Sequence, residues 1–204
     1  MAYVVVHPFM DDFHFIDFNS YESFPLDKKK GAAAAMILFL PIHFDANEGF
    51  ITIVSIVLLL LFIALPKRIP MPVALLIMIF NSYLGRATDN ILASPAPYDL
   101  YDTMDTHSYD LFDLLLYSLP YPLQGYLYVY FYDKFRLRGA YQAIHIIIWS
   151  VASIIFEAIG VWLSVFKYHG WHLSYSFPVY LLTFCLNSLL FHLAMKHNSL
   201  WKLK

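Results

Sequence analysis

The sequence has little charge and almost no cysteine, and both scarcities narrow the class of protein. Only 14% of its 204 residues are charged, against about 25% in an ordinary soluble domain. The single cysteine, Cys185, has no second cysteine with which to form an internal disulfide. The net charge of −2, without a basic patch interleaved with aromatic residues, excludes a nucleic-acid partner.

Signatures of soluble enzymes are also missing. The sequence contains no G-x-S-x-G, no Walker A loop, no H-E-x-x-H and no C-x-x-C pair. Its first residues lack the basic region and long apolar core of a cleavable signal peptide, so we expect later segments to direct membrane insertion. A membrane-embedded enzyme therefore ranks third among the function classes, and no catalytic residue is predicted.

Apolar residues are abundant instead. Hydrophobic residues make up 60% of the chain and aromatic residues 19%. A soluble domain of this size leaves much of its surface exposed, and so could not hide this much apolar area. The composition predicts an all-α fold, an integral membrane helical bundle with the lipid bilayer as its surroundings.

Five apolar segments are predicted to span the membrane. They are residues 50–66, 69–84, 111–132, 140–166 and 176–195. A bilayer core of about 30 Å needs about 20 helical residues, which the last three segments reach and the first two reach with their flanks. A sixth segment, 31–44, contains Pro41 and is either a span or a re-entrant or interfacial segment.

These segments define two regions of the chain and its orientation. We predict a peripheral N-terminal arm over residues 1–30 and a bundle of five or six transmembrane helices over residues 31–204. With Lys67 and Arg68 on the cytoplasmic side, and with segment 31–44 also spanning so that Lys28–Lys30 lie inside, only Arg86 and Lys167 of the 13 basic residues lie outside. The sequence therefore predicts a plasma-membrane protein with a cytoplasmic C-terminus and an acidic outer loop at about residues 85–110.

Two predicted outer segments gather acids and imidazoles that we consider as a divalent-metal site. The six candidate ligands are Asp99, Asp102, Asp105, His107, His169 and His172. Carboxylates suit calcium or magnesium, and added imidazoles suit zinc or manganese. The spacing does not match a calcium-binding loop, so a solvated connection rich in Asx turns is the alternative.

Two prolines lie inside the segment 111–132. Pro120 and Pro122 each remove a backbone donor and clash with the preceding helical turn. The resulting break, with Gln124 beside it, is typical either of a discontinuous helix at a transport site or of a plain kink.

A polar stripe follows the segment 140–166. Ser150, Ser153, Glu157, Gly160 and Ser164 recur at steps of three and four, so they share one helical face. Small and polar residues on a membrane helix favour contact with other helices. The stripe is therefore predicted to face the bundle interior.

Glu157 is the most conspicuous member of the stripe. A carboxylate inside a bilayer is costly and indicates a functional site, while a protonated glutamic acid bonded between helices is the structural alternative. We expect Asn187 or Thr183 of the last span as its partner. Arg86 or Lys167 would replace them if Glu157 lies nearer the outer surface.

An ordered set of motifs suggests a family. The motifs are "LPKRIP", "PYDLYD", "YDLFDLLLY", "YFYDKFRLRGAY" and "KYHGWHLSYSFPVYL". From about residue 50 onward the chain resembles an uncharacterised family of small multi-pass membrane proteins from spore-forming bacteria. The resemblance implies a bacterial plasma-membrane protein and assigns no substrate or reaction. Residues 1–48 depart from the family pattern.

Two function classes follow from these features. The first is small solute or ion transport or sensing through a polar bundle interior, lined by Glu157, Gln124 and Asn187, with the acidic loop as an outer gate or metal site. The second is a non-catalytic accessory or assembly subunit, whose polar stripe docks a partner membrane protein or another copy of the chain.

Overall fold

The computed structural model describes residues 44–93, 98–104 and 111–201, with side chains up to residue 198. The predicted N-terminal arm and nearly all of the candidate segment 31–44 lie outside these ranges. The described elements are α1 (Ala46–Ala64), α2 (Met71–Leu92), β1 (Tyr101–Thr103), α3 (Leu111–Ser118), α4 (Pro120–Lys134), α5 (Ala140–Trp162), β2 (Phe166–Tyr168) and α6 (Leu173–Trp201). The all-α prediction is confirmed, with one small sheet added among the described residues.

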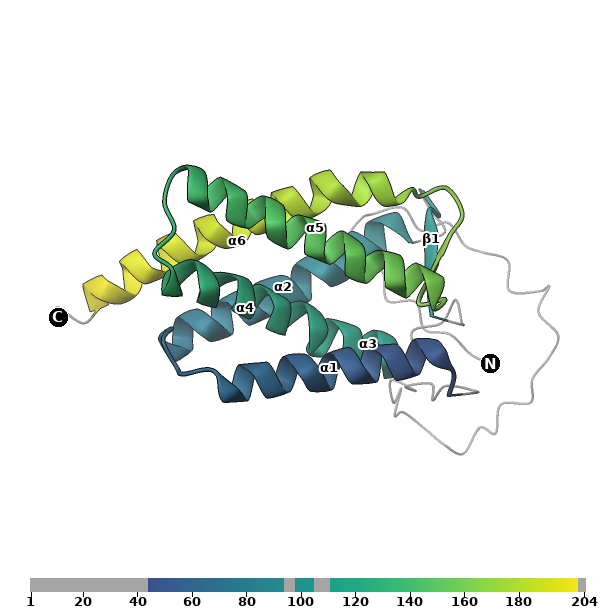
Figure 1. Ribbon diagram of the computed structural model, residues 1–204, viewed down its shortest axis with the longest axis horizontal. Coiled ribbons are helices and arrows are strands. Elements are labelled where there is room, and N and C mark those ends of the chain that lie inside the picture. Colours follow the sequence, from purple (N-terminus) through teal and green to yellow (C-terminus); the bar gives the residue numbers. More distant parts are fainter. Residues whose placement is uncertain (1–43, 94–97, 105–110, 202–204) are drawn as a thin grey trace, which may run out of the picture. The chain divides into compact units, whose positions relative to one another are not determined.

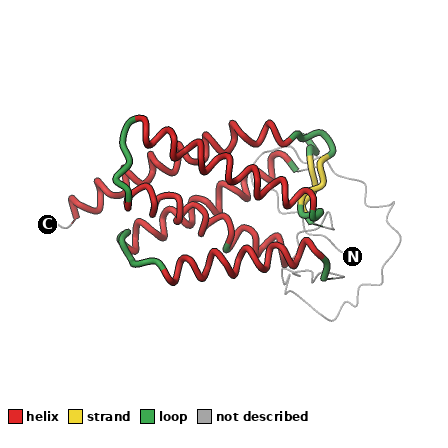
Figure 2. Tube along the Cα trace, in the orientation of Figure 1, coloured by secondary structure: helices red, strands yellow, loops and turns green. Residues whose placement is uncertain are grey.

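The helices pack side by side, and the sheet lies at one end of them (Figure 1). β1 and β2 are antiparallel, with Tyr101 opposite Tyr168 and Asp102 opposite Lys167. Figure 2 shows the paired strands in yellow. The sheet joins the connection between α2 and α3 to the connection between α5 and α6, which the sequence did not predict.

The predicted span 111–132 is two helices. Leu119 alone separates α3 from α4. Pro120 begins α4, where a missing N–H costs little because the first turn has no intrahelical acceptor for it. The Leu119 N–H donates to the Leu115 carbonyl at 2.9 Å, and its carbonyl accepts from Leu123 at 3.0 Å. The backbone around the prolines therefore stays largely paired, which favours the plain kink.

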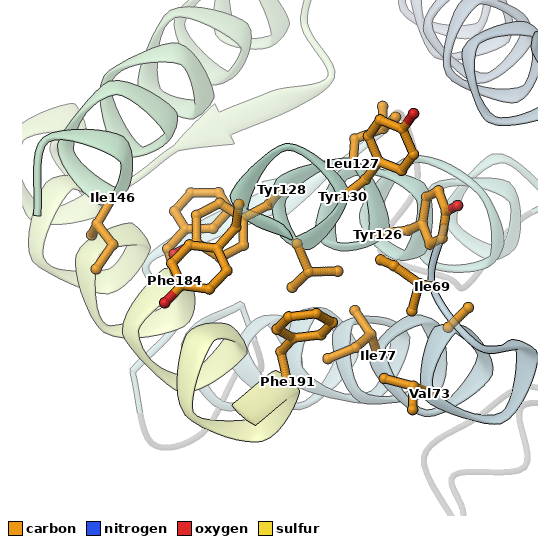
Figure 3. Packing of buried hydrophobic residues seen from close by; sticks show 13 residues of the cluster. Ile69, Val73, Ile77, Tyr126, Leu127, Tyr128, Tyr130, Ile146, Phe184 and Phe191 are labelled. Carbon is orange, nitrogen blue, oxygen red and sulfur yellow. The ribbon is translucent and has the colours of Figure 1, made fainter. Parts of the chain in front are cut away.

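α4 is the central helix of the bundle. It contacts α1, α2, α3, α5 and α6, and Tyr128 and Val129 are fully buried. Figure 3 shows Tyr128 of α4 next to Phe184 of α6, while Tyr130 points to the opposite side of α4. Aromatic residues of α4 therefore make up a large part of the core.

Within the described residues, four helices are long and apolar enough to cross a membrane: α1, α2, α5 and residues Leu173–Asn198 of α6. Their apolar side chains remain exposed, as at Ile53 (63%), Ile63 (68%) and Trp162 (81%). Such exposure suits contact with lipid rather than water. The predicted count of five or six spans is not confirmed, because α3 and α4 divide a predicted span and segment 31–44 is not described.

Helix α2 is longer than the sequence predicts. The predicted span ends at residue 84, whereas α2 continues through Thr88 and Asp89 to Leu92. The residues after Leu84 are more polar, so in the sequence they resemble the beginning of the acidic loop. The extension carries Asp89 into the interior at the sheet end of the bundle.

Candidate functional site

A cavity of about 60 Å³ lies where the sheet meets α2, α4, α5 and α6. We call it the carboxylate chamber. Its lining residues are Thr88, Asp89, Leu92, Tyr101, Tyr121, Glu157, Phe166, Tyr168, Trp171, Ser176, Val179 and Tyr180. Two of these are acids and, among these described lining residues, none is Lys, Arg or His.

Asp89 is held by two tyrosines from different elements. The Tyr101 hydroxyl of β1 donates to Oδ1 at 2.5 Å, and the Tyr117 hydroxyl of α3 donates to Oδ2 at 2.8 Å. Hydrogen bonds to an ionised acceptor are short and strong. Both oxygens of Asp89 are therefore fixed in position on the chamber wall.

Glu157 is held by one of its two oxygens. Oε1 accepts from the Tyr168 hydroxyl of β2 and from the Ser176 hydroxyl of α6 at 2.6 Å. Ser176 in turn accepts from the indole N–H of Trp171 at 2.9 Å. This chain of donors orients the carboxylate toward the chamber.

The other oxygen of Glu157, Oε2, is buried. It has no hydrogen-bond partner among the described residues. The Tyr180 hydroxyl lies within hydrogen-bonding range of the Glu157 carboxylate, but Oε2 itself accepts no direct hydrogen bond from a described residue. A buried acceptor without a donor costs about 1–3 kcal/mol, so Oε2 is a position where a bound donor would be stabilised.

The two strand tyrosines remain neutral donors. Burial, with a further contribution from Asp89, raises the pKa of the Tyr101 hydroxyl well above its usual value. Burial, with the hydrogen bond to Glu157, raises the pKa of Tyr168 likewise. Desolvation disfavours the phenolate, so both hydroxyls keep the proton with which they hold the carboxylates.

A second cavity, of about 80 Å³, adjoins the first, and we call it the amide chamber. The two cavities share Thr88, Asp89, Tyr121 and Tyr180. The amide chamber continues away from the sheet and is also lined by Asn81, Leu84, Gly85, Gln124, Gly125, Thr183 and Phe184.

Asn81 and Asn187 join α2 to α6 at the amide chamber. Asn81 Nδ2 donates to Asn187 Oδ1 at 2.7 Å, and Asn187 Nδ2 donates to Asn81 Oδ1 at 2.9 Å. Gly125 of α4 lies against this pair, since a Cβ there would be 2.1 Å from Asn81 Nδ2. The glycine therefore provides the space that the amide pair occupies.

Polar contacts continue along one face of α4, starting at Gln124 in the wall of the amide chamber. Gln124 Nε2 donates to Ser153 Oγ at 2.7 Å, and the Tyr128 hydroxyl lies 2.5 Å from Ser188 Oγ. One turn further, the Tyr132 hydroxyl lies 3.2 Å from His192 Nε2. Polar side chains thus extend from the sheet end toward the opposite end of the bundle.

The structure places most of the predicted intramembrane residues at this interior. Gln124 and Thr183 line the amide chamber, Asn187 joins its wall through Asn81, and Glu157 lines the carboxylate chamber. Ser150 and Ser153 are buried, and each donates its hydroxyl to the carbonyl four residues earlier. Gly160 is also buried, whereas Ser164 follows the end of α5.

The predicted partners of Glu157 are wrong. We expected Asn187 or Thr183, with Arg86 or Lys167 as the alternative, but Glu157 bonds to Tyr168 and Ser176. Asn187 pairs with α2 instead, because α6 turns that side chain toward Asn81.

The proposed metal ligands are brought together only in part. His169 Nε2, just after β2, lies at hydrogen-bonding distance, 2.7 Å, from Asp102 Oδ2 of β1. Asp99 and His172 are exposed, and Asp105 and His107 lie outside the described residues. Within the described ranges no group of three or more metal-binding side chains occurs. The full six-residue metal site therefore stays a prediction.

The sequence reasoning did not identify Asp89, Tyr101 and Tyr168 as site residues. A signal for Asp89 existed, because Asn81, Gly85 and Asp89 recur at steps of four and so continue one face of α2. No local pattern indicates the two tyrosines, whose roles depend on a sheet between strands more than 60 residues apart in the chain.

Comparisons with known proteins assign no family to the chain. No protein-family model, no curated protein and no solved structure matches it. The function is therefore inferred from the chemistry of the two chambers.

Proposed function

We propose that this protein is a small multi-pass transporter or sensor that takes up a small cation at the carboxylate chamber. One observation carries the proposal: Asp89 and Glu157 come from different helices to one cavity, and no basic residue lines it among the described residues. The two carboxylates are near enough to interact electrostatically. Two carboxylates in an apolar bundle without a neighbouring positive charge are costly, and a bound cation would lower that cost.

The adjoining amide chamber extends the polar cavity along the bundle axis, which favours a transport path over a closed binding pocket. Asn81, Gln124 and Thr183 offer neutral polar groups next to the acids, which suits a solute that moves along the bundle axis. Ion conduction requires several moderate sites rather than one tight site.

The accessory-subunit alternative finds less support. The polar stripe of α5 makes contacts within the chain, since Ser153 binds Gln124 of α4 and Glu157 binds Ser176 of α6. The stripe is therefore used by the bundle itself and not reserved for a partner membrane protein or a second copy.

The orientation and membrane belong to the same proposal. We propose a bacterial plasma membrane with the C-terminus in the cytoplasm, because from residue 50 onward this orientation leaves only Arg86 and Lys167 of the basic residues outside. A reporter fused after Lys204 should then be located in the cytoplasm. An exported reporter would contradict the orientation.

Carbodiimide labelling tests the chamber. Dicyclohexylcarbodiimide modifies carboxyl groups in apolar surroundings, so we expect modification at Glu157 and its loss from this position in Glu157→Gln. The control carboxylate is Asp133, which pairs with Arg68 at an exposed position and should not be labelled. Sodium, potassium, magnesium and methylammonium salts are then tested for protection. Protection by at least one of them is expected, and protection by none would overturn the proposal.

A further inference from the structure

The wall of the carboxylate chamber combines acids with aromatic rings. Besides Asp89 and Glu157, half of its twelve lining residues are aromatic. They are Tyr101, Tyr121, Phe166, Tyr168, Trp171 and Tyr180. Rings attract cations through the negative potential of their faces, and cages of aromatic rings are a recurring way to bind methylated ammonium groups.

The wall of the chamber offers few ligands for a metal ion. Calcium takes about 6–8 oxygen ligands, and magnesium demands near-octahedral oxygen coordination. Three of the four carboxylate oxygens already accept hydrogen bonds from tyrosine or serine hydroxyls. Only Oε2 of Glu157 is left, and no set of three metal-binding side chains occurs in the described part of the chain.

A bare proton would not require this wall either. Protonation of a carboxyl needs neither a cavity nor an aromatic lining, whereas the chamber has both. A ligand with its own N–H donor and its own apolar carbon uses all three features: the buried Oε2 acceptor, the second acid and the rings.

The size of the chamber limits the carbon content of that ligand. A water-sized sphere occupies about 10–15 Å³, so a cavity of about 60 Å³ holds only a few heavy atoms. An ammonium ion with one to a few carbons fits this space.

We propose that the carboxylate chamber binds a small aliphatic ammonium ion of the size of methylammonium, whose N–H donates to Glu157 Oε2 and whose carbon lies among the aromatic rings. The proposal rests on the proposed function and names the substrate class for the same chamber.

Calorimetric titration of the purified full-length protein in detergent tests the substrate class. Methylammonium chloride is compared with sodium, potassium and magnesium chloride at constant ionic strength. We expect saturable heat with methylammonium and at least about tenfold weaker binding of the three metal ions, since these gain less from the rings. Glu157→Gln should abolish the methylammonium heat.

Trp171 separates the aromatic contribution from the acids. Trp171→Leu removes the ring and should weaken methylammonium binding about tenfold, while Trp171→Phe keeps a ring and should restore most of the affinity. Trp162→Leu is the matched control, because Trp162 is 81% exposed and lies outside the chamber. Unchanged affinity in Trp171→Leu, with binding intact in the control, would overturn the aromatic role.

The two proposals fail in different ways. If a metal ion binds as tightly as methylammonium, or protects Glu157 from carbodiimide when methylammonium does not, the ammonium assignment is wrong and the cation chamber stands. If no cation protects Glu157 and none gives heat, both proposals are wrong.

Discussion

Tyr101 and Tyr168 face each other as partners in the two-stranded sheet, and each donates its hydroxyl to a different carboxylate. Tyr101 binds Asp89 of α2, and Tyr168 binds Glu157 of α5. One sheet, formed by two connections that are distant in sequence, thus fixes both acids of the chamber. The sheet is a structural part of the candidate site.

The first prediction concerns these tyrosine contacts. Tyr101→Phe and Tyr168→Phe should each lower the free energy of unfolding by about 1.5–3 kcal/mol, the range for hydrogen bonds to charged groups. The double variant should lose less free energy of unfolding than the sum of the two single losses, because the two side chains share one sheet. Unfolding in mixed micelles measures the change.

Tyr141→Phe is the control for this series. Tyr141 is 71% exposed, so its hydroxyl should contribute little to stability. A loss in Tyr101→Phe no larger than that in Tyr141→Phe would contradict the role of the sheet tyrosines.

The second prediction concerns alkaline pH. Burial raises the pKa of Tyr101 and Tyr168 above the ordinary value of 10.0. Above that pH the unfolded chain releases these two protons while the folded chain keeps them. The folded state then binds more protons, so stability decreases as pH rises; below about pH 10 both states are protonated and the two tyrosines contribute no slope.

Unfolding measured from about pH 8 to about pH 11 tests this dependence. The decline above about pH 10 should be steeper in the wild type than in the variant with both Tyr101→Phe and Tyr168→Phe. Tyr83→Phe, at a side chain that is 72% exposed, should keep the wild-type slope. Equal slopes in all three proteins would argue against the assigned pKa shifts.

The third prediction concerns Gly125. Gly125→Ala places a methyl group 2.1 Å from Asn81 Nδ2, so the amide pair must move. Overpacking of this kind costs about 1–3 kcal/mol. Gly49→Ala is the matched control, since nothing lies within 4 Å of a Cβ there, and alanine should stabilise that helix by about 0.5–1 kcal/mol. Unchanged stability in Gly125→Ala would contradict the prediction, because it would mean that Asn81 can move without loss of stability.

The fourth prediction concerns the pair of Asn81 and Asn187. Asn81→Leu alone leaves the buried Asn187 amide without its partner, which costs about 1–3 kcal/mol. Replacing both residues by leucine removes both amides, so the double variant should be more stable than either single variant. Thermal unfolding of the three variants decides this. A double variant that loses the sum of the single losses would show that the two amides act independently.

The interior of the bundle was partly predictable from sequence. Glu157 stands out because an acid within a long apolar run has few harmless explanations. Pro120 and Pro122 predict the interruption of 111–132 because proline lacks an N–H and clashes with the preceding turn. Both features depend only on residues close together in the chain.

Asp89 shows why the other half of the chamber was missed. It follows a polar run that resembles the beginning of a loop, and its place inside α2 depends on Tyr101 and Tyr117 from later segments. The partner of Glu157 was wrong for a similar reason. Asn187 lies on α6 as expected, but the packing of α6 against α2 directs its amide to Asn81.

The amino-acid sequence by itself determined the helical fold and the apolar character of the long helices, because hydropathy and proline positions act locally along the chain. The tertiary structure alone decided that α4 is the buried centre, that the connections around β1 and β2 form a sheet, and that Asp89 and Glu157 share one chamber. The physical reason is that a buried acid is stabilised by whichever donors the fold brings within hydrogen-bonding distance. Those donors are tyrosines and a serine contributed by other segments of the chain.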